Sequence, residues 1–192
     1  MEKEEVMLDF SNDSKWYSLH KDIWVQENFL SSEEISYFKN ILENMSEEKW
    51  NEAKNPIEWY NGKTSAALEE LKPINKRIAD IVAPLYEPTL NLSFTRMFPG
   101  DSMHEHKDTC EEEEATSNDD FGTCAITRYG VVVYVNDDFE GGELYYPELN
   151  LKYTPKAGDL VIHGALINHG VAKVTSGLRY AYASFLIDKV NK

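Results

Sequence analysis

The sequence has few cysteines, an excess of acidic over basic residues, and no long apolar run. Two cysteines in 192 residues are too few for a disulfide framework. A formal net charge of −15 argues against a general nucleic-acid binder, because phosphate contacts need clustered Lys and Arg. It argues equally against binding to an anionic membrane surface. No stretch approaches the roughly 20 apolar residues that span a bilayer.

The first residues of the sequence are charged. These residues, Met1-Glu2-Lys3-Glu4-Glu5, contain none of the apolar run of a signal peptide, so we expect a cytoplasmic protein. The length and the hydrophobic fraction of 42% are typical of one globular domain. We expect an N-terminal extension over residues 1–20 and a single domain over residues 21–192. Nothing in the sequence indicates the oligomeric state.

The first third of the chain carries helical patterns. Ser31 and Glu34 have the spacing of a capping box, which predicts that a helix begins here, after a short strand over Asp22–Phe29. The apolar residues that follow recur at helical intervals: Ile35, Phe38, Ile41, Leu42 and Met45. We expect a loop over Asn51–Lys63 and a second helix over residues 64–83, in which a proline at position 73 predicts a kink or a break.

From Leu90 onward the chain consists of short β-rich runs separated by Gly, Pro and Asn. This texture is typical of an all-β sandwich or barrel. The expected strands are Leu90–Phe98, Met103–Asp108, Ala125–Val135, Gly142–Tyr146, Asp159–His163, Gly170–Val174 and Leu178–Ile187. No internal repeat interrupts this pattern.

The expected strand Met103–Asp108 contains a candidate metal site. His106 and Asp108 lie two residues apart, so on a strand their side chains point to the same side. His169 follows later in the chain, and two histidines with one carboxylate form the facial triad of non-haem iron enzymes. His104 shares the face of His106, so a three-histidine site of His104, His106 and His169 is an alternative.

A possible anion site follows in the last expected strand. Arg179 lies ten residues after His169, and its guanidinium can bind a carboxylate in bidentate fashion while staying charged in a partly buried pocket. Ala181 and Ala183 share its face of the strand, where small side chains leave room for a five-carbon diacid. Both alanines are equally compatible with an ordinary core.

Several of these segments together resemble the 2-oxoglutarate/iron oxygenase superfamily, and within it the prolyl 4-hydroxylase-like branch. The resemblance runs from about Trp24 to Leu186. Its most specific segments are Phe98-Pro99-Gly100, His106-Lys107-Asp108, the tract from Tyr134 to Leu144 with its double glycine, and His169 through Arg179.

The resemblance implies a mainly β fold, a double-stranded β-helix (jelly roll) with N-terminal helices packed on one sheet. It implies that His106, Asp108 and His169 bind iron and that Arg179 pairs with the distal carboxylate of 2-oxoglutarate. Tyr134 occupies the position of a tyrosine that donates to the same carboxylate. Phe98 departs from the pattern, because many relatives have a tyrosine there that contacts the cosubstrate.

The activity implied by the resemblance is an Fe(II)- and 2-oxoglutarate-dependent dioxygenase. Such an enzyme uses O2 to hydroxylate a substrate carbon and releases succinate and CO2, with ascorbate as a supporting reductant. We expect the substrate to be a prolyl residue of a peptide or protein. The alternatives are a free amino acid or other small molecule as substrate, and a non-catalytic cupin-like metal-binding module.

Three further features have open interpretations. The acidic segment over residues 109–123 is either a solvated loop or a mobile lid that attracts a basic or polar peptide. Cys110 and Cys124 bracket this segment and are either free thiols or a loop-closing disulfide. His163 ends an apolar run, and we interpret it as a strand-end residue near the pocket mouth.

Overall fold

The computed structural model describes residues 7–51, 60–89, 93–109 and 127–189. The helices are α1 (Ser32–Glu43), α2 (Glu47–Asn51) and α3 (Lys72–Val82), with 3-10 turns η1 (Glu69–Leu71) and η3 (Pro147–Leu149). The strands are β1 (Trp16–His20), β2 (Ile23–Gln26), β3 (Tyr60–Ala67), β4 (Tyr86–Pro88), β5 (Ser93–His106), β6 (Thr127–Tyr134), β7 (Glu140–Gly141), β8 (Leu144–Tyr146), β9 (Leu151–Tyr153), β10 (Leu160–Gly164), β11 (His169–Val171), β12 (Val174–Ser176) and β13 (Arg179–Asp188).

The strands form one long, curled antiparallel sheet. Its order is β1-β2-β10-β6-β13-β5-β11-β8-β9, with β3 also paired to β5, and β4 to β13. The two halves of strand β5 pair with different strands. Phe94–Met97 pair with β13, whereas Met103–His106 pair with β11. A shift in register against β3 and a glycine with a φ of 103° at position 100 lie between these two halves. The result is the double-stranded β-helix that the sequence resemblance implies.

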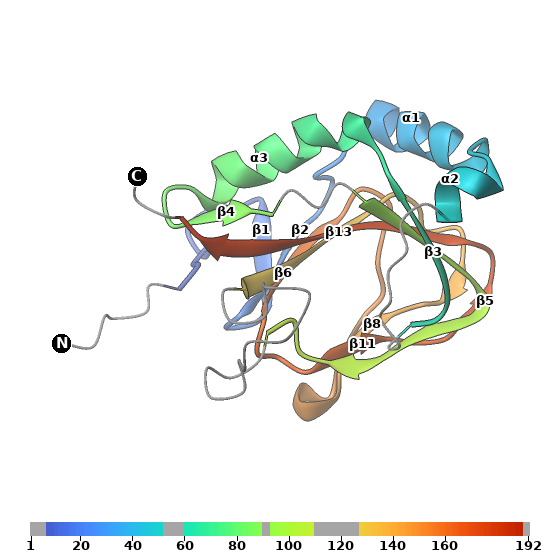
Figure 1. Ribbon diagram of the computed structural model, residues 1–192. Coiled ribbons are helices and arrows are strands. Elements are labelled where there is room, and N and C mark those ends of the chain that lie inside the picture. Colours follow the sequence, from blue (N-terminus) through green and yellow to red (C-terminus); the bar gives the residue numbers. More distant parts are fainter. Residues whose placement is uncertain (1–6, 52–59, 90–92, 110–126, 190–192) are drawn as a thin grey trace, which may run out of the picture.

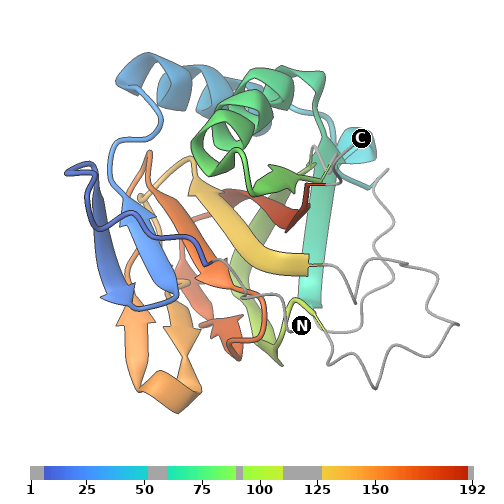
Figure 2. The same ribbon diagram turned by 90° about the vertical axis from the view of Figure 1, so that its left-hand side faces the viewer.

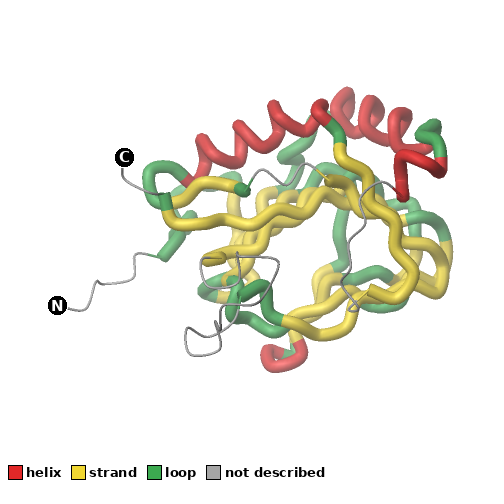
Figure 3. Tube along the Cα trace, viewed as in Figure 1, coloured by secondary structure: helices red, strands yellow, loops and turns green. Residues whose placement is uncertain are grey.

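The helices cover one face of this sheet. Figures 1 and 2 both show α1 and α3 lying over the sheet that contains β6 and β13, and the tube in Figure 3 shows these helices on one side of the strands. None of the described helices is long and apolar enough to cross a membrane.

Alternation along the strands sorts the core into two layers. Residues that face the helices include Val131 and Val133 of β6 and Tyr182 of β13, which pack with Phe38 of α1 and Ile78 of α3. The intervening residues point to the other face of the sheet. They include Tyr134, Val161 and Ala181, which pack with Leu144 and Tyr146. The candidate site lies on this second face, inside the curl of the sheet.

The predicted start of α1 is confirmed. The side chain of Ser31 accepts from the backbone N–H of Glu34 at 3.2 Å, and the Glu34 carboxylate accepts from the backbone N–H of Ser31 at 2.8 Å. The prediction of a helix over residues 64–83 is wrong in its first part. Residues 64–67 belong to β3, and the helix begins at Lys72 with Pro73 in its first turn, where proline is well accommodated.

Several expected boundaries also change. Residues 60–63, expected in a loop, belong to β3, and the two runs on either side of residues 99–102 form the single strand β5. The run Gly170–Val174 is divided between β11 and β12. Strand β1 was not expected, and it pairs with β2. The acidic segment after Thr109, including Cys110, and the second cysteine at position 124 lie outside the described residues.

Candidate active site

His106 and His169 are direct cross-strand partners. His106 is the last residue of β5, His169 is the first residue of β11, and the two pair in the antiparallel ladder. Their ring centres are 4.5 Å apart. Asp108 follows β5 by two residues, and its backbone N–H donates to the carbonyl of Ala165 at 2.9 Å, which holds the carboxylate beside both rings.

The potential ligand atoms of these three residues converge. Oδ1 of Asp108 lies 3.6 Å from Nε2 of His106 and 3.6 Å from Nε2 of His169. All three ligand atoms lie within 4.8 Å of one another. Nδ1 of each ring lies 2.9 Å from a backbone carbonyl, of His104 for His106 and of Ile167 for His169. A neutral imidazole that donates through Nδ1 has its lone pair on Nε2, so both rings present a lone pair toward the same point.

The electrostatics of His169 and Asp108 favour the forms that bind a metal. Burial lowers the pKa of His169 to about 3, so this ring is neutral. Burial tends to raise the pKa of Asp108, but its contacts with His106 and His163 outweigh burial and hold the pKa well below its ordinary value. A neutral imidazole and an ionised carboxylate are the forms that coordinate metals. At His106, burial tends to lower the pKa, but the contacts with Asp108 and with the carbonyl of His104 outweigh burial and raise it.

His104 does not join this group. Its side chain is exposed, and its backbone carbonyl serves as the partner of Nδ1 of His106. The alternative site of His104, His106 and His169 is therefore not the arrangement that the structure has. The converging group contains the carboxylate of Asp108 instead.

His163 does not lie at the mouth of a pocket, and that interpretation was wrong. The residue is 1% exposed, and its Nε2 lies 3.1 Å from Oδ2 of Asp108. On its other side, Nδ1 lies 2.9 Å from the hydroxyl of Tyr146. Its inward position follows from strand alternation, since it shares the face of Val161 on β10, but the sequence carries no signal for the contact with Asp108.

A cavity of about 40 Å³ begins at His169 and reaches Arg179. As expected from the spacing on β13, both Ala181 and Ala183 line it. The remaining lining residues are Thr95, Met97, Met103, Val132, Leu144 and Val171. The walls are thus mostly apolar, and the polar residues among them are Thr95, His169 and Arg179.

Arg179 is buried at 3% exposure, yet no carboxylate pairs with it among the residues that the structure describes. Its Nε donates to the carbonyl of Gly142 at 3.2 Å, and one terminal nitrogen contacts the Met97 sulfur at 3.6 Å. Burial of a guanidinium without a counter-charge is unfavourable. An anion that enters the cavity would supply that charge.

Tyr134 lies beside Arg179. Its ring centre is 5.1 Å from the guanidinium carbon, its side chain is fully buried, and its hydroxyl has no hydrogen-bond partner within the described part of the chain. Burial raises the pKa of the Tyr134 hydroxyl, against the opposing effect of Arg179, so the group is a neutral donor.

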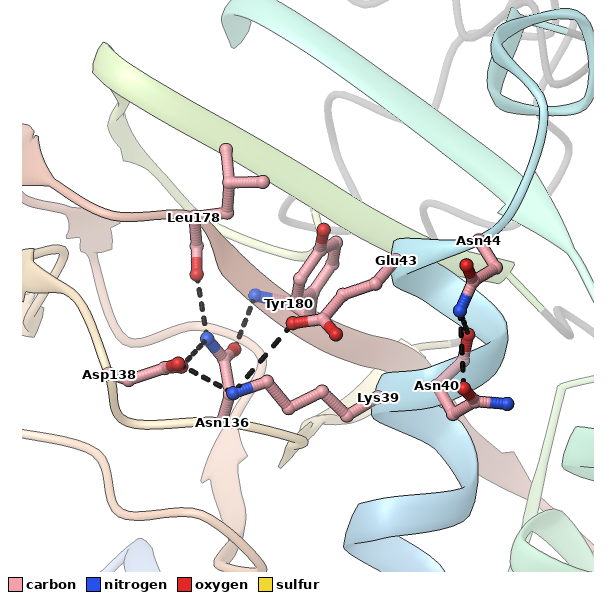
Figure 4. Close-up of polar contacts among 8 residues, drawn as sticks. All are labelled: Lys39, Asn40, Glu43, Asn44, Asn136, Asp138, Leu178 and Tyr180. Carbon is pink, nitrogen blue, oxygen red and sulfur yellow. Dashed lines mark hydrogen bonds and ion pairs between the residues drawn. The ribbon is translucent and has the colours of Figure 1, made fainter.

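The backbone on either side of Arg179 is held by one asparagine. The amide of Asn136 donates to the carbonyl of Leu178 at 2.7 Å, and its oxygen accepts from the N–H of Tyr180 at 2.8 Å (Figure 4). The same amide donates to Asp138, whose carboxylate lies 2.5 Å from Nζ of Lys39 on α1. The resemblance includes the tract that contains Asn136, but it predicts no role for this residue.

Phe98 lies away from the cavity. Alternation on β5 directs Thr95 and Met97 inward, whereas the Phe98 ring lies 4.6 Å from the guanidinium of Arg96 and is 37% exposed. Its missing hydroxyl therefore does not leave an unfilled position in the cavity lining.

The sequence of this chain matches a family profile described as the 2OG-Fe(II) oxygenase superfamily over residues 92–187. It is 27% identical over 120 residues to a putative prolyl 4-hydroxylase of Acanthamoeba polyphaga mimivirus, covering 57% of this chain and 50% of that protein. It is 40% identical over 62 residues to human prolyl 3-hydroxylase 2, covering 29% of this chain and 9% of that protein. The chain thus spans half or less of the length of these curated relatives.

Solved structures with the same fold include a prolyl-4-hydroxylase of Pseudomonas putida, with a TM-score of 0.65 at 16% identity, covering 88% of this chain and 93% of that chain. A viral collagen prolyl hydroxylase from Paramecium Bursaria Chlorella virus-1, in its 2OG complex, has a TM-score of 0.63 at 18% identity, covering 86% and 96%. A Trichoplax adhaerens prolyl hydroxylase in complex with a hypoxia-inducible-factor peptide has a TM-score of 0.65 at 17% identity, covering 87% and 84%. At these identities the likeness establishes the double-stranded β-helix.

Proposed function

This chain belongs to the 2OG-Fe(II) oxygenase superfamily, and from that premise we propose that it hydroxylates a prolyl residue of a peptide or protein. One observation carries the proposal. The converging ligand atoms of His106, Asp108 and His169 adjoin a cavity that contains a buried guanidinium without a carboxylate partner in the described chain.

The residues present fit iron(II) and 2-oxoglutarate. Two imidazoles and one carboxylate form a donor set that suits Fe(II) and leaves coordination positions open. Arg179 and the unpartnered Tyr134 hydroxyl are donors that match the distal carboxylate of a five-carbon diacid. When bound, iron(II) and 2-oxoglutarate supply a reaction in which one atom of O2 hydroxylates the substrate and the other is incorporated into succinate, with release of CO2.

The chain contributes binding, orientation and exclusion of water. The carbonyls of His104 and Ile167 orient the two imidazoles, and Arg179 with Tyr134 would orient the diacid along the cavity. The apolar walls exclude water from the space between these groups, which strengthens every charge interaction inside it. Ascorbate would act from solution, as a reductant that keeps the iron in its divalent state.

The choice of a prolyl substrate is supported by the relatives, which are named prolyl 4-hydroxylase and prolyl 3-hydroxylase, and by the peptide bound to the Trichoplax enzyme. The net charge of −15 favours a basic or neutral peptide over an acidic one. We therefore propose a proline-containing peptide without excess negative charge.

The test is a peptide library incubated with the protein, iron(II), ascorbate and 2-oxoglutarate, read by mass spectrometry for the gain of one oxygen atom. The gain is expected on proline, with one succinate formed for each hydroxylation. Oxygen gain on another amino acid, or only on small molecules, would overturn the prolyl assignment. Absence of succinate with every candidate would favour a metal-binding module without catalysis.

A further inference from the structure

Oδ2 of Asp108 has its own partner within the protein. Nε2 of His163 lies 3.1 Å from it, and Nδ1 of His163 lies 2.9 Å from the Tyr146 hydroxyl. The three side chains are 7% or less exposed, so water does not compete for these bonds. Oδ1, the other oxygen, lies 3.6 Å from Nε2 of both His106 and His169. The two oxygens of this carboxylate therefore face different partners.

The ionised form of Asp108 determines the role of Nε2 of His163, and the neutral form of the ring then determines the role of Nδ1. An ionised carboxylate only accepts, so Nε2 of His163 must carry the proton that it donates to Asp108. In the neutral ring Nδ1 then has a lone pair, and it accepts from the Tyr146 hydroxyl. Tyr146 thus selects the tautomer of His163 that can bind Oδ2.

Strand β6 has a glycine where the contact between Asp108 and His163 needs space. Gly130 of β6 is the direct cross-strand partner of His163 on β10. A Cβ at position 130 would lie 2.2 Å from Oδ2 of Asp108 and 2.2 Å from Nε2 of His163. A glycine inside a strand marks a close approach, and here the approaching atoms are the two that form the bond. No side chain larger than hydrogen leaves room for it.

We propose that His163, oriented by Tyr146, is a positioning residue that occupies Oδ2 of Asp108, so that this carboxylate binds metal through Oδ1 alone. Single-oxygen binding keeps open the coordination positions that the cosubstrate and O2 require. This inference rests on the metal site of the proposed function. The three ligands alone do not ensure single-oxygen binding, because an unpaired Oδ2 of Asp108 could also bind the metal. The contact with His163 would prevent this.

The test is cobalt(II) binding to the full chain, with cobalt as an air-stable probe for iron(II). Affinity is measured by titration calorimetry, and the cobalt visible absorption reports the ligand geometry. His163→Phe keeps an aromatic ring of similar size and removes the donor. We expect it to bind cobalt about 10- to 100-fold more weakly, the usual effect of losing a partner of a metal ligand, and with an altered spectrum.

Three further variants separate positioning from packing. His163→Gln restores an amide donor, so it should recover part of the affinity, which a purely structural role would not predict. Tyr146→Phe removes one hydroxyl and should weaken binding about tenfold, the lower end of the same range. His20→Phe makes the matched change on β1, which β2 separates from His163, at a histidine outside the group of ligands, and should bind cobalt as the unsubstituted protein does.

The outcomes are distinguishable. Unchanged cobalt affinity and spectrum in folded His163→Phe would overturn the proposal. If that variant does not fold, unchanged binding by Tyr146→Phe overturns it, and weakened binding supports it. If the unsubstituted protein itself binds no cobalt, the metal site of the proposed function fails.

Discussion

The guanidinium carbon of Arg179 lies 5.1 Å from the ring centre of Tyr134, and both side chains are buried. In the described chain the guanidinium has no carboxylate and the hydroxyl has no acceptor. Buried polar groups are normally satisfied and buried charges are normally paired, so a guanidinium without a counter-charge beside a hydroxyl without a partner indicates that a ligand completes both. A small diacid that reaches from the candidate metal ligands to this pair would do so.

Arg179→Met should weaken 2-oxoglutarate binding. Loss of one partner of a buried, hydrogen-bonded charge pair costs about 2 kcal/mol or more, roughly a 30-fold rise in Kd. The measurement is calorimetric titration of 2-oxoglutarate into the cobalt-loaded protein. Arg128→Met is the matched control, because Arg128 pairs with Asp188 in an exposed ion pair away from the cavity. Equal affinities of the two variants would contradict the assignment of Arg179.

Tyr134→Phe should have opposite effects on binding and stability. Its hydroxyl has no partner in the described chain, so removing it should raise the free energy of unfolding of the ligand-free protein by about 1 kcal/mol or more. The same hydroxyl would bind the diacid, so the Kd for 2-oxoglutarate should rise about tenfold. Urea unfolding and titration measure the two quantities. A loss of stability would show that the hydroxyl already has a partner.

Asn136→Ala should destabilise the strand start that carries Arg179. The substitution leaves the N–H of Tyr180 and the carbonyl of Leu178 without their side-chain partner, at a cost of about 1–3 kcal/mol. Urea unfolding should show this loss, together with weaker 2-oxoglutarate binding. Lys39→Ala, which removes only the exposed ion pair with Asp138, should cost about 0–1 kcal/mol. Equal losses in the two variants would refute the role of Asn136.

Asp159 should make stability depend on pH. Burial raises the pKa of this carboxyl from its ordinary value of 3.8, despite donation from Tyr153 and the N–H of Lys156. The folded protein therefore binds the proton more tightly than the unfolded chain. Between 3.8 and the raised pKa, this group makes the free energy of unfolding fall as pH rises.

Asp159→Asn cannot titrate and keeps an oxygen that accepts from both donors. The unfolding free energy of the native protein should therefore fall relative to that of the variant as pH rises through the window, and then stay level. Urea unfolding of both proteins across this window measures the difference. Parallel profiles would show that the carboxyl is not perturbed in the folded protein.

The position of Asp108 relative to the two histidines could be anticipated from sequence, whereas its other neighbours could not. His106 and Asp108 are close in sequence and strand geometry aligns them, and the resemblance supplied His169. The contacts of Asp108 with His163, and of His163 with Tyr146, depend on how β10 and β8 are brought together, which no local pattern encodes. The sequence likewise does not explain why position 130 is a glycine, because the explanation is the close approach of Asp108 and His163 in the folded protein.

The misassigned segment at residues 64–67 has a similar cause. Leu68, Leu71, Ile74 and Ile78 recur at helical intervals, but the residues before Leu68 do not form a helix. Residues 63–67 instead pair with Ser93–Met97 of β5, a long-range contact that overrides local preference. Pro73 was the better guide, since proline in a first turn marks where a helix begins.

The most direct test of the central claim is conversion of 2-oxoglutarate to succinate by the purified protein with iron(II) and O2, compared with Asp108→Ala. We expect succinate from the unsubstituted protein, even without the proper substrate at a slow uncoupled rate, and none from the variant. His104→Ala, altered at an exposed neighbouring histidine, should retain the conversion. Equal succinate formation by the protein and its Asp108→Ala variant would contradict the metal centre on which the account depends.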